Sequence, residues 1–314
     1  MTTRVEAPAK INLFLEVFGK RADGYHDLRS LLTPISLCDD MDFEIRPDGG
    51  VSTEMDLDEL PEIVGVSIAD SDGNLTTRAA RLLQQETGCR LGVRIRIKKR
   101  IPIGGGLGGG SSDAATTLTT LNRIWGTALP QTRLVELAAR LGSDIPALVR
   151  GGVVAVEGMG ERVIPLQAPA GRSLEPWWLV VLNPGFSTST RDIYERYKTL
   201  LTSAPESYNN MRSALLTGNV RLAASNLFNS LESTVFDKYP LERMLVSRLR
   251  EEGALGAMVS GSGSSIFALA GDEGHARELE KNLRSRSDVA MWSRVAKTMP
   301  DSVMVAHDPL EVRV

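Results

Sequence analysis

The chain has 314 residues, of which 42% are hydrophobic, 24% charged and 5% aromatic, and this is the composition of a soluble folded protein, not of a disordered or fibrous one. Its formal net charge of −3 excludes the broad basic surface that holds nucleic acid or an anionic membrane. Two cysteines without a CxxC motif, and no apolar leader or membrane-spanning run, predict a cytoplasmic protein without a disulfide framework or structural zinc.

The N-terminal part combines strand and helix patterns. Partial alternation of apolar and polar residues predicts strands at 11–17 and 41–47, and GVRIRIKKR at 92–100 places three apolar residues on one face of a third strand. Between them, residues 74–88 have helical periodicity, with Ala79, Leu82 and Leu83 inward and Gly88 as the stop.

Two helices are predicted in succession after a glycine run at 104–110. Apolar residues at Ala114, Leu118, Leu121 and Trp125 have spacings of four, three and four, which describe one helix face. Pro130 then opens a second helix that ends at Gly142, so no strand separates the two.

The C-terminal part alternates strand and helix candidates. Strands are predicted at 153–156 and 177–182, and as a pair, 257–260 and 265–270, around the glycine-serine stretch 260–265. Helices are predicted at 189–202, 219–233, 240–252 and 273–284. Together the patterns predict an α+β fold in two domains, 1–160 and 161–314.

The run IPIGGGLGGGSSDAA at 101–115 predicts an anion site. Glycines that lead into a helix let backbone N–H groups approach a ligand, and Ser111 and Ser112 could cap that helix or meet a phosphate or its magnesium ion. A Walker A loop is excluded because Ser111, not Lys, follows Gly110. The dinucleotide pattern G-x-G-x-x-G is formally met, which leaves a nicotinamide-dependent oxidoreductase as an alternative beside a flexible surface loop.

The glycine run and three further stretches resemble the GHMP kinases, the superfamily named after galactokinase, homoserine kinase, mevalonate kinase and phosphomevalonate kinase. The three stretches are APAKINLFLEVFGKRADGYHDLRSLL at 7–32, LGSDIPALVRGG at 141–152 and GAMVSGSGSSIFAL at 256–269. The resemblance implies a ribosomal-protein-S5-like N-terminal domain, a C-terminal antiparallel sheet flanked by helices, and ATP and Mg²⁺ bound between them.

Within that superfamily, PAKIN together with RADGYH resembles the branch whose acceptor is the small molecule 4-diphosphocytidyl-2-C-methyl-D-erythritol, phosphorylated on its 2-hydroxyl in the non-mevalonate isoprenoid pathway. A GHMP kinase for homoserine, mevalonate or a sugar remains an alternative, as does a catalytically silent nucleotide-binding module. No nucleic acid or membrane partner is expected, and the chain is expected to be a monomer or a weak homodimer.

The resemblance assigns the chemistry to Asp144 and Lys10. Asp144 occupies the position of the general base that accepts the proton of the substrate hydroxyl, and Lys10 lies where a cation would offset charge in the transition state. Taken alone, Asp144 would suit a helix N-cap and Lys10 an ordinary solvated lysine.

The resemblance also implies the two binding regions. Tyr25 and Tyr194 would enclose the cytosine, His26 and Asn12 would hydrogen-bond the substrate, and Gly261 and Gly263 would support the site or form a simple hairpin turn. The hydroxyl of Ser111 or Ser112 would lie near the magnesium ion, and no acidic ligand for the ion is identified from the sequence. The residues expected at ATP are Asn74, Lys99, Pro102, Gly104, Gly105, Gly106, Gly108, Gly109, Gly110, Ser111 and Ser112.

Overall fold

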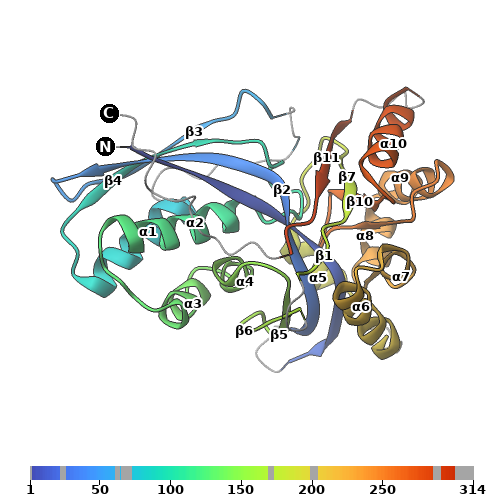
Figure 1. Cartoon of the computed structure of the whole chain (residues 1–314), viewed down its shortest axis with the longest axis horizontal. Coiled ribbons are helices and arrows are strands. Elements are labelled where there is room, and N and C mark those ends of the chain that lie inside the picture. Colours follow the sequence, from blue (N-terminus) through green and yellow to red (C-terminus); the bar gives the residue numbers. More distant parts are fainter. Residues whose placement is uncertain are drawn as a thin grey trace.

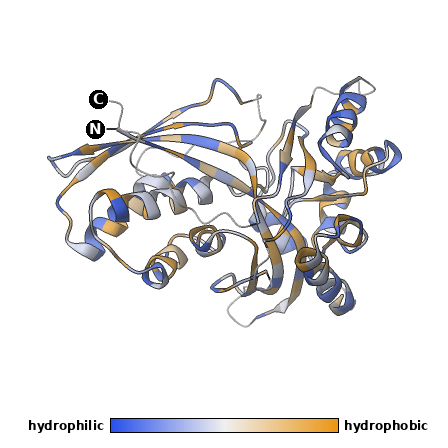
Figure 2. Cartoon of the chain, in the orientation of Figure 1, coloured by the Kyte–Doolittle hydropathy of each residue, from blue (hydrophilic) through white to orange (hydrophobic). Residues whose placement is uncertain are grey.

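The computed structural model describes residues 2–21, 26–60, 64, 73–168, 173–198, 204–285 and 291–300. A large mixed sheet and a smaller antiparallel sheet stand next to each other, and each carries its own group of helices (Figure 1). Apolar residues line the strands and the inward helix faces, and polar residues concentrate on the outer helices (Figure 2). Among the described helices, none is long and apolar enough to cross a membrane.

The large sheet is built on one long antiparallel pair, β1 (Thr2–Lys20) and β2 (His26–Arg46). Around this pair lie β3 (Val51–Asp56), β4 (Gly92–Lys98), β5 (Val154–Gly158), β6 (Arg162–Pro165) and β8 (Phe228–Asn229), with the order β3-β4-β2-β1-β8 and with β5 between β2 and β6. The predicted strands 11–17 and 41–47 are parts of β1 and β2. Register shifts between Pro8 and Lys10 and between Asn12 and Phe14 interrupt the strict alternation, so the sequence pattern showed only part of β1.

Four helices cover one face of the large sheet: α1 (Leu75–Thr87), α2 (Gly109–Ile124), α3 (Gln131–Ala139) and α4 (Ile145–Arg150) (Figure 1). The predicted helix at 74–88 is confirmed. Asn74 is its N-cap, with the side chain accepting from Thr76 N at 2.8 Å, and Gly88 ends it at φ +67°. The predicted inward face of α2 is confirmed as well, since Ala114, Leu118 and Leu121 are fully buried.

The smaller sheet has the order β11-β7-β10-β9, and all its neighbours are antiparallel, as expected. Its strands are β7 (Trp178–Asn183), β9 (Gly256–Val259), β10 (Ile266–Leu269) and β11 (Trp292–Lys297). The helices of this part are α5 (Thr190–Arg196), α6 (Pro205–Thr217), α7 (Val220–Ser225), α8 (Glu232–Lys238), α9 (Pro240–Glu251) and α10 (Glu273–Ser285).

Two helix predictions in the C-terminal part were wrong in their extent. The helix predicted at 189–202 is α5, which ends at Arg196 because Tyr197 has an extended backbone, and residues 199–202 lie outside the described residues. Residues 219–233 form α7, the short strand β8 and the start of α8, not a single helix. The Asn226 side chain donates to Leu222 O at 2.8 Å and so closes α7, and Phe228 and Asn229 then pair in parallel with β1. A two-residue strand has no periodicity of its own, so tertiary pairing decides its structure.

The domain boundary at residue 160 stays a prediction. Residue 160 lies in the turn between β5 and β6, which pair with each other in the large sheet. Strand β8, from the C-terminal part, also joins that sheet through β1. The two halves are therefore joined by sheet pairing as well as by the chain.

The two glycine-rich loops pack directly against each other where the two sheets meet. Ser260 Oγ donates to Gly106 O at 3.1 Å, and Ser265 N donates to Gly105 O at 2.9 Å. Gly106 has φ +75°, and a Cβ there would lie 2.2 Å from Ser260 O. Only glycine fits this position, because both the backbone conformation and the space exclude a side chain.

A buried carboxyl lies behind the second of these loops. The Glu242 side chain on α9 is fully buried, and neither of its oxygens has a hydrogen-bond partner among the described residues. A Cβ at Gly263 would lie 3.1 Å from its Oε2. Burial, with a smaller contribution from the charge of Glu232, raises the pKa of Glu242 to about 9.

We predict that Gly106→Ala lowers the free energy of unfolding by about 2–4 kcal/mol, because it combines a positive φ with a clash against backbone. The matched variant is Gly110→Ala in α2, where the nearest atom to a new Cβ is 4.0 Å away. It should change stability by less than about 1 kcal/mol, in the stabilising direction. Urea unfolding measures both, and equal effects of the two variants would contradict the packing described here.

We predict that the stability of the wild type falls as pH rises from about 5 to 9, with a contribution from Glu242 of up to about 1.4 kcal/mol per pH unit. The folded chain holds the proton of Glu242 to about pH 9, whereas the unfolded chain releases it near 4.5, so higher pH favours unfolding. Glu242→Gln should remove this part of the slope.

The control is Glu251→Gln, an exposed glutamate on the same helix, which should keep the wild-type slope. Urea unfolding at pH 5, 7 and 9 gives the three slopes. Parallel curves for the wild type and Glu242→Gln would show that Glu242 is ionised in the folded protein.

Candidate active site

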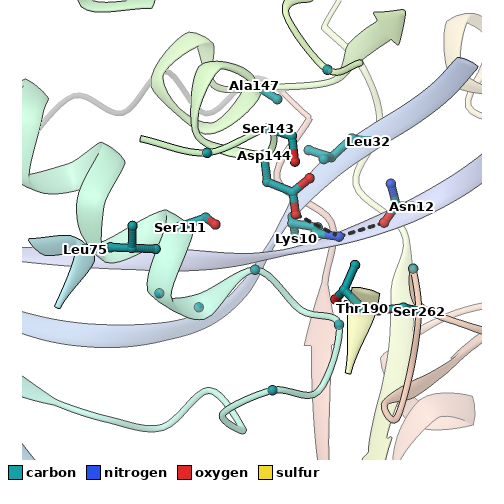
Figure 3. Close-up of a pocket in the computed structure, with 18 of the residues that line it drawn as sticks. Lys10, Asn12, Leu32, Leu75, Ser111, Ser143, Asp144, Ala147, Thr190 and Ser262 are labelled. Atoms are coloured by element: carbon teal, nitrogen blue, oxygen red, sulfur yellow. Dashed lines mark hydrogen bonds and ion pairs between the residues drawn. The ribbon is translucent and has the colours of Figure 1, made fainter. Parts of the chain in front are cut away.

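A cavity of about 1320 Å³ lies between the two glycine-rich loops, β1, and the starts of α2, α4 and α5. This volume exceeds that of a single small-ligand pocket and has room for two ligands at once. Figure 3 shows Lys10, Asp144 and Asn12 gathered in this cavity, with Ser111 to one side and Thr190 and Ser262 to the other. The cavity therefore brings together segments that lie far apart in the sequence.

Lys10 is the buried cation of this group. Its side chain on β1 is 5% exposed, and its Nζ lies 3.5 Å from Asp144 Oδ2 and donates to Asn12 Oδ1 at 2.7 Å. Asn12 in turn donates to Ser30 Oγ at 2.9 Å, and Ser30 Oγ donates to Phe14 O. This chain of hydrogen bonds fixes the ammonium group on the strand, so Lys10 is not the ordinary solvated lysine of the alternative interpretation.

Asp144 stands directly before α4, at the N-cap position, but its side chain makes no capping hydrogen bond. It is 42% exposed and faces Lys10 (Figure 3). A carboxylate that is open to the cavity and adjacent to a buried cation can accept a proton from a bound hydroxyl. The arrangement therefore suits a general base and does not suit a cap.

The first glycine-rich loop, 104–110, leads into a helix N-terminus with unpaired N–H groups among the described residues. Gly108, at φ +69°, is the N-cap of α2, and Ser112 N makes the first helical hydrogen bond, to Gly108 O. The N–H groups of Gly109, Gly110 and Ser111 make no hydrogen bond to any described residue and are available for an anion. The prediction that Ser111 and Ser112 cap this helix was wrong, because both lie inside its first turns.

The two serines differ in position. Ser111 lines the cavity, whereas Ser112 is fully buried, is not part of the lining, and has no hydrogen-bond partner for its Oγ among the described residues. The other residues expected at ATP all line the cavity: Asn74, Lys99, Pro102, Gly104, Gly105, Gly106, Gly108, Gly109 and Gly110. Ser111 is therefore the serine with access to a ligand.

Lys99 is held by two carboxylates. Its Nζ donates to Asp39 Oδ2 at 2.5 Å and to Asp113 Oδ2 at 2.7 Å, and all three side chains are buried. Burial lowers the pKa of Lys99, but the charges of Asp113 and Asp39 outweigh it and leave that pKa raised. Burial, with the charge of Asp39, raises the pKa of Asp113 to about 7. The group joins β2, the residue that follows β4, and α2 beneath the first glycine-rich loop.

Aromatic residues form the opposite end of the cavity. The rings of His26 and Tyr194 lie 5.7 Å apart, and Tyr197 packs edge-on to His26 at 6.1 Å. His26 and Tyr194 line the cavity. Burial, with smaller contributions from Asp144 and Tyr197, raises the pKa of Tyr194, which keeps its hydroxyl neutral. Tyr25, expected in the same region, lies outside the described residues.

The second glycine-rich loop completes the wall: it is the turn between β9 and β10, and part of it borders the cavity. A role in substrate binding stays a prediction. Gly261 and Ser262 line the cavity, and a Cβ at Gly261 would lie 3.6 Å from Lys10 Nζ. Ser262 Oγ and Thr190 Oγ1 share a hydrogen bond of 3.0 Å. Gly263 is not part of the lining and packs against Glu242 instead.

Sequence reasoning missed several residues of the cavity lining, and also Asp39, which lies behind the lining. Asp39 and Asp113 carry no spacing signal, because they meet Lys99 only in the folded chain. For three further lining residues the only sequence signal was a predicted neighbour. Thr190 and Arg191 shortly precede Tyr194, and Ser262 stands between the two glycines of the second loop.

Comparison with known proteins gives the family. Residues 74–152 match the family described as GHMP kinases N terminal domain, and residues 211–288 match GHMP kinases C terminal. A 4-diphosphocytidyl-2-C-methyl-D-erythritol kinase of Alkalilimnicola ehrlichii is 45% identical over 215 residues, which are 68% of this chain and 67% of the relative. One of Pelotomaculum thermopropionicum is 37% identical over 288 residues, 92% of this chain and 96% of the relative.

The solved structures agree with this result. A crystal structure of 4-(cytidine 5'-diphospho)-2C-methyl-D-erythritol kinase superimposes with a TM-score of 0.73 at 33% identity, over 94% of this chain and 99% of that one. A homoserine kinase from Cytophaga hutchinsonii also has a TM-score of 0.73 but is only 19% identical, so it shares the fold alone. With relatives of this identity along most of its length, the chain belongs to the 4-diphosphocytidyl-2-C-methyl-D-erythritol kinases, phosphotransferases of the GHMP kinase superfamily.

Proposed function

We propose that this protein transfers the γ-phosphoryl group of ATP to the 2-hydroxyl of 4-diphosphocytidyl-2-C-methyl-D-erythritol. The observation that carries the proposal is a cavity in which the Lys10–Asp144 pair lies between the first glycine-rich loop, 104–110, and the aromatic wall of His26 and Tyr194. This loop is called the phosphate loop below. The family of the chain supports the same substrate.

The nucleotide end consists of the phosphate loop and the start of α2. Free N–H groups at Gly109, Gly110 and Ser111 would bind the triphosphate, aided by the positive end of the helix dipole. Lys99 is already paired with two carboxylates, so its role would be to fix α2 relative to β4 and to present its stem to the nucleoside. Most of the phosphate binding thus falls to backbone.

At the acceptor end, Asp144 would take the proton of the 2-hydroxyl as that oxygen attacks the γ-phosphorus. Lys10, 3.5 Å from Asp144 Oδ2, would stabilise negative charge on the transferring group from its buried position. Asn12 holds Lys10 in place and would present its side-chain amide to the substrate. The positions of these groups are set before any ligand binds.

Magnesium fits this site as a companion of the nucleotide. The described residues contain no cluster of three His, Cys, Asp or Glu side chains that could bind a metal alone, and Mg²⁺ commonly takes most of its ligands from phosphates and water. The hydroxyl of Ser111, which lines the cavity at the start of α2, would be the protein's contribution. The ion would neutralise charge between the phosphates.

The cytosine would lie at the aromatic end. Tyr194 offers a ring face for stacking, and His26 offers hydrogen-bonding nitrogen atoms beside it. Tyr25 would add a second ring. The distance between this end and Asp144 would then be spanned by the ribose and the diphosphate of the substrate.

The first test is release of ADP with Mg-ATP and one of four acceptors: 4-diphosphocytidyl-2-C-methyl-D-erythritol, mevalonate, homoserine or galactose. We expect turnover on the cytidine compound alone, because only that substrate uses the aromatic wall. A reaction without acceptor is the control for ATP hydrolysis. Turnover on one of the other three would leave the phosphate loop and Asp144 in place but reject the cytosine site.

A second test addresses the general base. Asp144→Asn should lower kcat by about 10²–10⁴-fold, with the KM for ATP nearly unchanged, because the amide cannot accept the proton while the phosphate loop stays intact. The control is Asp237→Asn, whose side chain is 78% exposed on α8. Wild-type turnover by Asp144→Asn would reject the assigned role.

A further inference from the structure

Arg191 is a cationic side chain of the cavity lining that has no ion-pair partner among the described residues. The described lining contains three lysine and arginine side chains, Lys10, Lys99 and Arg191. Lys10 pairs with Asp144, and Lys99 pairs with Asp39 and Asp113. Within the part of the chain that the structure describes, Arg191 makes neither an ion pair nor a hydrogen bond.

Arg191 lacks an ion pair although an acidic residue stands at the right spacing on the same helix. Glu195 follows Arg191 by four residues on α5 and also lines the cavity, and oppositely charged residues at this spacing on a helix commonly pair. On the same helix, Arg196 does form such a pair with Asp192, at 2.9 Å. Arg191 is thus an exposed arginine at the cavity, and none of its guanidinium N–H groups is taken up by another described residue.

The position of Arg191 lies between the two parts of the acceptor site. Thr190, the residue before it, bonds to Ser262 in the loop that borders Lys10. Tyr194, one helical turn after it, packs beside His26. Helix α5 therefore begins beside the loop that borders Lys10 and reaches the aromatic end of the cavity at Tyr194. Arg191 lies on the helical turn between these two points.

We propose that Arg191 binds the diphosphate of the acceptor substrate and so determines its specificity for a nucleoside-diphosphate ester; this rests on the function proposed above. A cytidine-diphosphate ester whose base lies at Tyr194 and whose alcohol lies at Asp144 places its two phosphates between those points. A guanidinium group presents paired N–H donors that match phosphate oxygens. The other two cations of the cavity are already neutralised by carboxylates.

The test compares Arg191→Met, which keeps a similar apolar stem without the charge, with Arg196→Met. The second variant removes an identical charge from the same helix at a side chain that is 59% exposed and pairs with Asp192. At saturating Mg-ATP, Arg191→Met should raise the KM for the cytidine substrate by about tenfold, with kcat and the KM for ATP nearly unchanged. Arg191→Lys should fall between Arg191→Met and the wild type, because it keeps the charge but not the paired donors.

Inhibition by fragments of the substrate identifies which group Arg191 contacts. CDP and cytidine are measured as inhibitors competing with the cytidine substrate. In Arg191→Met the inhibition constant for CDP should rise by about tenfold while that for cytidine stays unchanged. Equal shifts for both would place Arg191 at the base or ribose and overturn the proposal, as would wild-type constants throughout.

The wild type separates this inference from the function itself. If the wild-type protein does not phosphorylate the cytidine substrate, the proposed function fails, whatever Arg191 does. If it does, and Arg191→Met behaves as Arg196→Met, only the role of Arg191 fails. Unchanged thermal unfolding of all three variants confirms that the kinetic differences arise in the site.

Discussion

The contact between the two glycine-rich loops is the constraint on which the site depends. Gly106 lies so close to the backbone of Ser260 that no side chain could separate them, and two hydrogen bonds join the loops. The first loop leads into the free N-terminus of α2, and the second borders Lys10. Because they are packed together, the start of α2 and the Lys10–Asp144 pair are held at one separation; under the proposed function this fixes the two reacting groups relative to each other, as phosphoryl transfer requires.

The buried cations of the described cavity are paired with carboxylates. Lys10 is buried and pairs with one carboxylate, and Lys99 is buried and pairs with two, so neither of these buried cations of the described cavity is unpaired. The N–H groups at the start of α2 and the exposed Arg191 have no partner among the described residues. Under the proposed function, they would let a protein of net charge −3 bind two highly anionic substrates without a basic surface.

Local sequence signals predicted much of the fold. Asn74 and Gly88 bracket α1, and apolar spacing marks the inward face of α2, because both depend only on nearby residues. The short elements α4 and β8 escaped prediction since their structure comes from distant partners. Within the site, glycine spacing predicted the anion loop, but only the resemblance to a family pointed to Lys10 and Asp144, which lie far apart in the chain. No local pattern could show that Asp39 and Asp113 hold Lys99.

The pairing of β1 with β8 has a consequence for biosynthesis. Strand β1 is made long before the residues that complete its edge. Phe14 and Leu15 pair with Phe228 and Asn229, and Val17 N donates a hydrogen bond to Ser230 Oγ, 213 residues later. Until most of the chain has been made, that edge stays open to pairing with other strands. Synthesis of more than 200 residues therefore separates this edge from the segment that covers it.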